Sequence, residues 1–284
     1  MSKIKRAYHY RFYPTDEQEQ QLARTFGCCR YVYNWALRLS MDTYQETGKG
    51  LSYTQLSAQL TMLKQNEETA FLSEVSCVPV QQSLRHLKRA YVNFFEGRAG
   101  FPQFKKRHGA QTAEYTRSAF TYKDGVLTLA KMNGPLSIRW SRPLPHRAQP
   151  STVTVSRDES GRYFVSLLFE EEITPLPKKE TQIGIDLGLK TMVVTSLGQT
   201  FPNPRYAARE ATKLARAQRR LARKQKGGKN REKQRRRVAK IHAHIVDRRR
   251  NHQHQRISPP RSREPNDRRR EPGGQEYDAA SHPC

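Results

Sequence analysis

The chain has 284 residues, and its 52 Lys and Arg residues against 26 Asp and Glu residues give a formal net charge of +26. This length allows one large or two modest domains, and the charge indicates a polyanionic partner, with nucleic acid ahead of an anionic membrane surface. No segment approaches the roughly 20 apolar residues of a membrane-spanning helix, no signal peptide is recognisable, and the 4 cysteines include no CxxC pair. We therefore expect a cytoplasmic protein with no membrane partner, no disulfide framework and no complete zinc site.

Residues 3–13 read KIKRAYHYRFY, in which aromatic and apolar residues alternate with basic ones. This period of two predicts a strand, and its basic, aromatic character suits a sheet that faces nucleic acid. An ordinary half-exposed strand is the alternative. Pro14 ends the strand, and its candidate nucleic-acid contacts are Lys5 and Arg11.

A helical segment is expected at residues 15–110. It opens with a capping box at Thr15–Gln18, and apolar residues at helical spacing predict a helix to about Thr47. Further helices are expected at Thr54–Lys64 and from Pro79, and the closing run GFPQFKKRH places aromatic residues beside basic ones, which suits a grip on a nucleic-acid backbone. The candidate nucleic-acid contacts here are Arg30, Tyr31, Asn34, Arg85, Lys88, Lys105, Lys106 and Arg107. For the basic residues of the third helix, a solvated face is the commoner alternative.

From about Glu114 the period changes to two. Alternating runs separated by turns at Asp-Gly, Asn-Gly and Ser-Gly predict strands between residues 119 and 169. With residues 1–14 these strands form a predicted β-barrel, which makes the helical segment an insertion into it. A Pro-containing linker is expected at Glu170–Lys179.

The segment Ile183–Gly198, IGIDLGLKTMVVTSLG, predicts two short strands joined by a tight turn. Asp186 is the one carboxylate in the first, otherwise apolar strand. A buried acid is costly without a partner, and a divalent metal ion is one such partner. A hairpin whose Asp caps a turn is the alternative.

Residues 202–250 predict two intensely basic helices separated by Gly227 and Gly228. Like charges at this density destabilise a free helix, so neutralisation by phosphates is a better account than a solvated face. The candidate nucleic-acid contacts in this part of the chain are Lys190, Lys213, Arg216, Arg219, Arg220 and Arg223.

Five segments occur in a fixed order: YRFYPT, GCCRYVYNWAL, GFPQFKK, YFVSLLFE and IGIDLGLKTMVVTSLG. Together they resemble the TnpB (OrfB) family of insertion-sequence-encoded RNA-guided DNA endonucleases, also described as transposases and related to type V CRISPR effectors. The resemblance runs from about residue 3 to about residue 250, and a set of spaced motifs is far more specific than the Asp motif alone.

The resemblance implies an α+β multidomain fold. Residues 1–14 and 111–177 would form a β-barrel wedge domain, residues 15–110 its helical recognition insertion, and residues 178–250 an incomplete RuvC-like nuclease domain of RNase H type. The resemblance also implies a guide RNA and a double-stranded DNA target as partners, in the nucleoid of a bacterium or archaeon. Asp186 falls where the family has its first catalytic, Mg²⁺-binding carboxylate.

The C-terminal part departs from the family pattern. A RuvC-like site needs two further carboxylates to hold its metal ions, whereas residues 251–284 are poor in apolar residues and rich in Pro, Arg and Gly, which predicts disorder. Advancing the codons of Pro260–Tyr277 by one nucleotide permits LVRENQTIVVENLAVKNM, which resembles the missing strand with its Glu. We therefore predict a frameshift near Arg250, a truncated chain and an out-of-frame tail. Re-reading the gene across Val246–Gln255 tests this.

Three functions from different classes follow from these observations. The first is an RNA-guided endonuclease by descent that is catalytically defective as this polypeptide. The second is an RNA-guided DNA-binding repressor without cleavage, and the third is a nonspecific basic RNA-binding protein. A further outcome is that the nuclease part does not fold, because an RNase H sheet without its later strands leaves an exposed edge.

Overall fold

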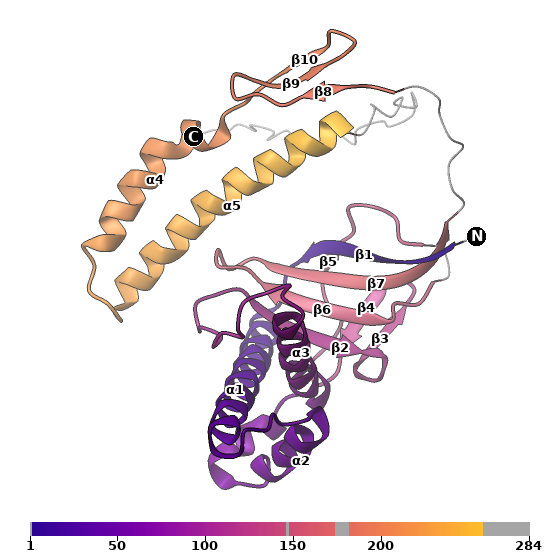
Figure 1. Cartoon of the computed structure of the whole chain (residues 1–284), viewed down its shortest axis with the longest axis vertical. Coiled ribbons are helices and arrows are strands. Elements are labelled where there is room, and N and C mark those ends of the chain that lie inside the picture. Colours follow the sequence, from indigo (N-terminus) through magenta and orange to yellow (C-terminus); the bar gives the residue numbers. More distant parts are fainter. Residues whose placement is uncertain (1, 146–147, 174–181, 258–284) are drawn as a thin grey trace, which may run out of the picture.

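A long antiparallel strand pair forms the centre of the molecule. Strand β1 (Ser2–Phe12) pairs with β7 (Tyr163–Ile173) along its whole length. The computed structural model describes residues 2–145, 148–173 and 182–257. Figure 1 shows helices on one side of this curled sheet and a long helical hairpin on the other.

The sheet has five strands in the order β2-β6-β7-β1-β5, and a separate hairpin, β3–β4, completes a curled half-barrel. The other strands are β2 (Gln111–Thr116), β3 (Phe120–Lys123), β4 (Val126–Leu129), β5 (Ile138–Arg139) and β6 (Thr152–Arg157). The predicted alternation of β1 is confirmed, because Tyr10 and Phe12 are buried while Lys5 and Arg11 are exposed. The buried side chains pack with Leu127 of β4 in the main core.

Helix α1 (Asp16–Thr47) has the predicted capping box, with Thr15 and Gln18 exchanging hydrogen bonds, and its C-cap is Gly48 at φ 67°. It packs with α2 (Tyr53–Leu63), the 3₁₀ helix η1 (Glu67–Ser73) and α3 (Cys77–Phe95) around a second core that includes Val32, Leu60 and Leu84. Helices α1 and α3 contact β2, so the helical layer lies against this edge strand of the sheet.

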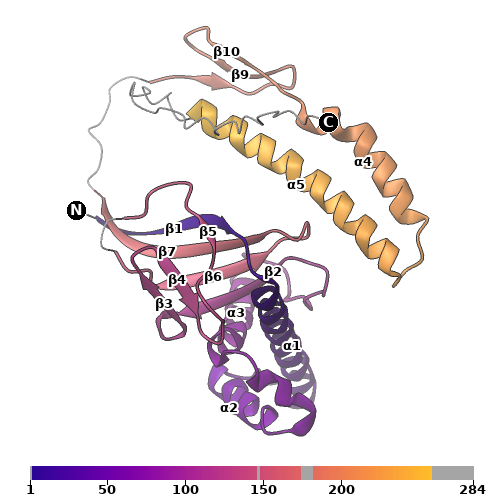
Figure 2. The same ribbon diagram turned by 180° about the vertical axis from the view of Figure 1, so that it is seen from behind.

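The C-terminal described part has a small sheet and two helices. Strands β8 (Ile185–Asp186), β9 (Thr191–Thr195) and β10 (Thr200–Pro202) are antiparallel. Helices α4 (Tyr206–Ala222) and α5 (Lys229–Ile257) form the basic hairpin, which Figure 2 shows from behind. Ala217, Ile241 and Ile245 form its core. Within the described ranges, none of the helices has the length and apolar character needed to cross a bilayer.

Several sequence-based boundaries are corrected. Strand β7 continues to Ile173, so the linker expected from Glu170 begins too early. Helix α3 starts before Pro79, and α5 continues past residue 250 to Ile257, so the predicted disorder of residues 251–257 is wrong. The rest of the predicted tail, residues 258–284, lies outside the described residues, and the frameshift stays a prediction.

Candidate nucleic-acid interface

Helix α4 presents one strongly basic face. Its apolar side, around Leu214 and Ala217, packs on α5, which leaves the predicted residues Lys213, Arg216, Arg219, Arg220 and Arg223 exposed. Lys213 pairs with Glu210 at 3.4 Å, whereas the four arginines form no ion pair with any described residue. The structure thus brings these five predicted contacts together on one helix.

Polar side chains that the sequence analysis did not single out hold the hairpin in shape. The side-chain amide of Gln234 donates to the carbonyl of Ala217 at 3.0 Å, between the helices. The guanidinium of Arg231 donates to the carbonyls of Leu221 and Lys224 at 2.9 and 2.8 Å, at the C-terminal end of α4. Because nine of the fifteen residues 223–237 are basic, no sequence signal distinguishes Arg231 from its neighbours.

A few polar contacts of α5 attach the hairpin to the rest of the molecule. Asp247 of α5 accepts a hydrogen bond at 2.5 Å from Arg162, which directly precedes β7 and whose guanidinium also pairs with Asp158 at 2.8 Å. At the other end of α5, the Arg235 side chain donates to the carbonyl of His108 at 2.9 Å. The hydrogen bond from Arg235 lowers the pKa of Glu232, which lies 3.7 Å from the ring of His108.

The sheet face toward α5 is basic and aromatic. The His9 ring stacks on Phe164 with centroids 4.9 Å apart, and the guanidinium of Arg11 lies 5.1 Å from the ring centroid of Tyr13. Burial, followed by the charges of Arg250 and Arg142, lowers the pKa of His9. Lys5 and Arg11 are exposed, as predicted.

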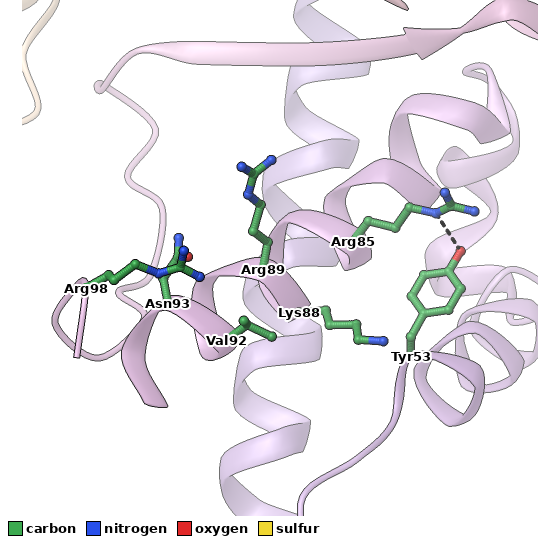
Figure 3. Close-up of a pocket in the computed structure, with 7 residues that line it drawn as sticks. All are labelled: Tyr53, Arg85, Lys88, Arg89, Val92, Asn93 and Arg98. Carbon is green, nitrogen blue, oxygen red and sulfur yellow. Dashed lines mark hydrogen bonds between the residues drawn. The ribbon is translucent and has the colours of Figure 1, made fainter. Parts of the chain in front are cut away.

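Helix α3 carries a second basic site, which lies beside α2. Figure 3 shows a pocket of about 500 Å³, and it is lined by Tyr53, Arg85, Lys88, Arg89, Val92, Asn93 and Arg98. Two of these residues, Arg85 and Lys88, are predicted contacts. Arg89 lies on the same basic side of the third helix that the sequence predicts, whereas Tyr53 and Arg98 were missed because they come from other elements.

Asn34 and Lys105 are engaged within the protein. The Asn34 side chain donates to the Lys105 carbonyl at 3.0 Å and accepts from its backbone N–H at 2.8 Å. The Lys105 ammonium lies 4.2 Å from the ring centroid of Tyr33, and burial lowers its pKa. Lys106 and Arg107, which follow, are exposed. The pair of Asn34 and Lys105 therefore fastens the basic loop Lys105–His108 to α1. A direct contact of Asn34 or Lys105 with nucleic acid stays a prediction.

Arg30 and Tyr31 lie on α1, away from the other candidates of this segment. Arg30 is half-buried, and Tyr31 is partly exposed with its ring 5.4 Å from that of Phe71 in an edge-on contact. Phe71 belongs to η1, and neither Arg30 nor Tyr31 lines the pocket on α3.

Asp186 differs from expectation because it is exposed. Its neighbours Ile185 and Leu187 are also 64% and 72% exposed, so no burial penalty demands a cation at this position. Lys190 is exposed on the turn before β9. Among the described residues, no cluster of three or more His, Cys, Asp or Glu side chains is placed to hold a metal ion. The side chains around Asp186 therefore do not fit a two-metal nuclease site.

Family comparisons match both ends of the described chain. Residues 1–49 match a family described as "Helix-turn-helix domain", and residues 158–258 match one described as "Probable transposase", both of the OrfB type of IS605 elements. The described residues of the first range contain strand β1, Ser2–Phe12, and the uninterrupted helix α1, Asp16–Thr47.

The chain is similar to proteins of several bacteria. The chain is 54% identical over 250 residues, 88% of its length, to a "Putative RNA-guided DNA endonuclease" of Streptomyces pristinaespiralis, and 31% identical over 249 residues, 87% of its length, to "Putative RNA-guided DNA endonuclease InsQ" of Escherichia coli K12. It covers 62% and 61% of these proteins, so it spans about three-fifths of their length. It is also 32% identical over 106 residues, 34% of its length, to "Virulence protein VsdF" of Salmonella dublin, and covers 89% of that protein.

Among solved structures, the chain is similar to one titled "Cryo-EM structure of CRISPR-Cas12f Ternary Complex". The TM-score is 0.34 at 14% identity, over 86% of this chain and 60% of that chain.

Proposed function

Because the chain belongs to the TnpB (OrfB) family, we propose that it takes part in RNA-guided recognition of DNA. In this proposal its described residues bind a guide RNA and a double-stranded DNA target. The observation that carries it is the exposed face of α4, where four arginines lack a counter-charge among the described residues. Phosphates supply that charge, and their neutralisation by Lys and Arg dominates nucleic-acid affinity.

The domain assignment belongs to the same proposal. Strands β1 to β7 would be the wedge domain, α1 to α3 the recognition insertion, and β8 to α5 the first part of a RuvC-like domain. The α1–α3 layer inserted between β1 and β2 supports the first two assignments. The third assignment, to a RuvC-like domain, is supported only by the order in which the short β8–β10 sheet and the two helices follow one another along the chain.

Binding without cleavage is the form of this function that the geometry favours. Asp186 is exposed on β8, and the described residues contain no cluster of three or more His, Cys, Asp or Glu side chains placed to hold a metal ion. A two-metal mechanism needs several carboxylates around a pair of cations. No cleavage step is therefore assigned to the described residues, and a Mg²⁺ site at Asp186 stays a prediction.

Two assays test the proposal. Footprinting of a target duplex with the full chain and guide RNA should give guide-dependent protection that weakens steeply with salt. A supercoiled-plasmid assay with guide RNA and Mg²⁺ should show no nicking above background. Robust nicking that Asp186→Ala abolishes would contradict binding without cleavage, and equal affinity for unrelated RNAs would favour the nonspecific RNA-binding alternative.

A further inference from the structure

The pocket on α3 collects cations from two elements. Arg85, Lys88 and Arg89 lie within about one helical turn, and Arg98 is supplied by the segment after the helix (Figure 3). Arg98 is ion-paired with Glu96. Lys88 and Arg89 form no ion pair or hydrogen bond with any described residue, and Arg89 interacts with Glu114 only through the electrostatic field, so two positive charges at this pocket have no direct partner among the described residues.

Tyr53 at the start of α2 orients one of the arginines. The Nε of Arg85 donates to the Tyr53 hydroxyl at 3.4 Å, and the guanidinium carbon lies 5.4 Å from the ring centroid. This arrangement leaves the terminal nitrogens of Arg85 free to meet an anion. Figure 3 shows the Lys88 side chain extending toward the same tyrosine.

The chemistry of the lining indicates an anion with more than one charge. None of the lining residues is acidic, and Glu114, whose charge interacts with Arg85 and Arg89, already pairs with His86 at 2.8 Å. Like charges three and four residues apart destabilise a helix by a few tenths of a kcal/mol each. A bound polyanion relieves this repulsion.

We propose that the α3 pocket binds two neighbouring phosphates of a nucleic-acid backbone, with Tyr53 as a positioning residue for Arg85. Arg85 and Arg89 are one turn apart, about 6 Å along the axis, which is of the order of the spacing between successive phosphates. This inference rests on the proposed function and deepens it, because it adds a phosphate site separate from α4. The two sites lie on opposite sides of the sheet in both views (Figures 1 and 2).

The test compares salt slopes of binding. The full chain is titrated with a labelled DNA duplex of about two helical turns over a series of salt concentrations. Lys88→Gln/Arg89→Gln should lower the magnitude of the log–log slope by about 1 to 2 and weaken binding roughly tenfold or more at 0.1 M salt. The matched control, Lys49→Gln/Lys123→Gln, removes the same charge at two exposed positions outside the pocket and should leave the slope unchanged.

A second variant tests the role of Tyr53. Tyr53→Phe keeps the ring and removes the hydroxyl, so it should weaken DNA binding by a few-fold at an unchanged melting temperature. A purely structural role would change the melting temperature instead. Inorganic tripolyphosphate is titrated in parallel, and the nucleic-acid assignment predicts that it competes with DNA far more weakly than unlabelled duplex does.

The outcomes separate the two proposals. If the wild-type chain shows no salt-dependent binding, the proposed function fails and the pocket inference fails with it. If the wild type binds but the pocket variant keeps the slope of the control, only the pocket inference is overturned. Tight tripolyphosphate binding with an unchanged DNA slope would also overturn it, in favour of a free-polyphosphate site.

Discussion

At the scale of single residues, Asn34 joins α1 to the basic loop that follows α3. Its amide satisfies both backbone polar groups of Lys105. We expect Asn34→Ala to lower the free energy of unfolding by about 1–3 kcal/mol, because it leaves a partly buried N–H and carbonyl without partners. Urea unfolding measures this. Asn34→Asp keeps the acceptor and should lose less, and an unchanged unfolding free energy for the alanine variant would contradict the clamp.

The pair of His86 on α3 and Glu114 on β2 makes stability depend on pH. The hydrogen bond with His86 lowers the pKa of Glu114 below its ordinary value of 4.5. Since the folded-state pKa is the lower one, the unfolded chain binds more protons in this range, and the contribution present above about pH 4.5 is lost as the pH falls through the folded value. Both side chains are partly exposed, 38% and 27%, so the effect should be below about 1 kcal/mol.

Unfolding free energies measured in urea at neutral pH and in mild acid check this expectation. Glu114→Gln should flatten the acid limb relative to the wild type. Glu159→Gln, at an exposed carboxylate without an ion pair among the described residues, is the control and should leave it unchanged. An acid limb of equal steepness in Glu114→Gln would show that another carboxylate is responsible.

At the scale of elements, the end of α4 depends on Arg231. Its guanidinium donates to the carbonyls of Leu221 and Lys224, where the Leu221 carbonyl also accepts a 3.2 Å bond from the Lys224 N–H. We expect Arg231→Ala to fray the last turn of α4, which hydrogen exchange would detect as faster exchange of the amides near residues 219–224. Arg237→Ala, at an exposed position on α5, is the control. Equal exchange in both variants would rule out this capping role.

Elements with a clear period were predictable, and elements set by long-range partners were not. The repeat in β1 and the capping box of α1 gave a strand and a helix with nearly correct bounds. The acidic run Glu170–Glu172 was placed in a linker because it opens a segment that contains prolines. It continues β7 because Lys5 and Lys3 of β1 lie directly opposite Glu170 and Glu172, where opposite charges stabilise strand pairing.

In the candidate nucleic-acid interface, too, local sequence patterns predicted some features, and features that depend on long-range packing were missed. The arginines of α4 were predictable from local charge density, because a helix with one apolar side exposes the rest. The pocket on α3 was not, since Tyr53 and Arg85 are distant in sequence and meet only through packing of α2 on α3. The exposure of Asp186 was also missed, because the apolar residues around it are typical of a buried strand.

At the scale of the whole molecule, the basic hairpin is attached to the sheet by a small number of polar contacts. Asp247 bonds Arg162, and Arg235 bonds the His108 carbonyl. Because the side chains of Arg162 and Asp247 are 23% and 51% exposed, their ion pair is worth at most about 1 kcal/mol and weakens with salt. The angle between hairpin and sheet should therefore respond to a single charge change.

We expect Asp247→Asn to loosen this docking, as measured by energy transfer between dyes on Cys77 and on a cysteine placed at Gln218 of α4, with Cys284→Ser as background. Cys77 is exposed, whereas burial raises the pKa of Cys28 to about 11 and of Cys29 to about 12, which keeps both thiols unreactive. In the variant, the mean transfer efficiency should fall and its distribution should broaden. High salt should produce the same change in the wild type. Glu159→Gln, with the same charge change on the sheet side, should leave transfer unchanged. If Asp247→Asn matches that control, the hairpin is held by its other contacts and the ion pair does not set its position.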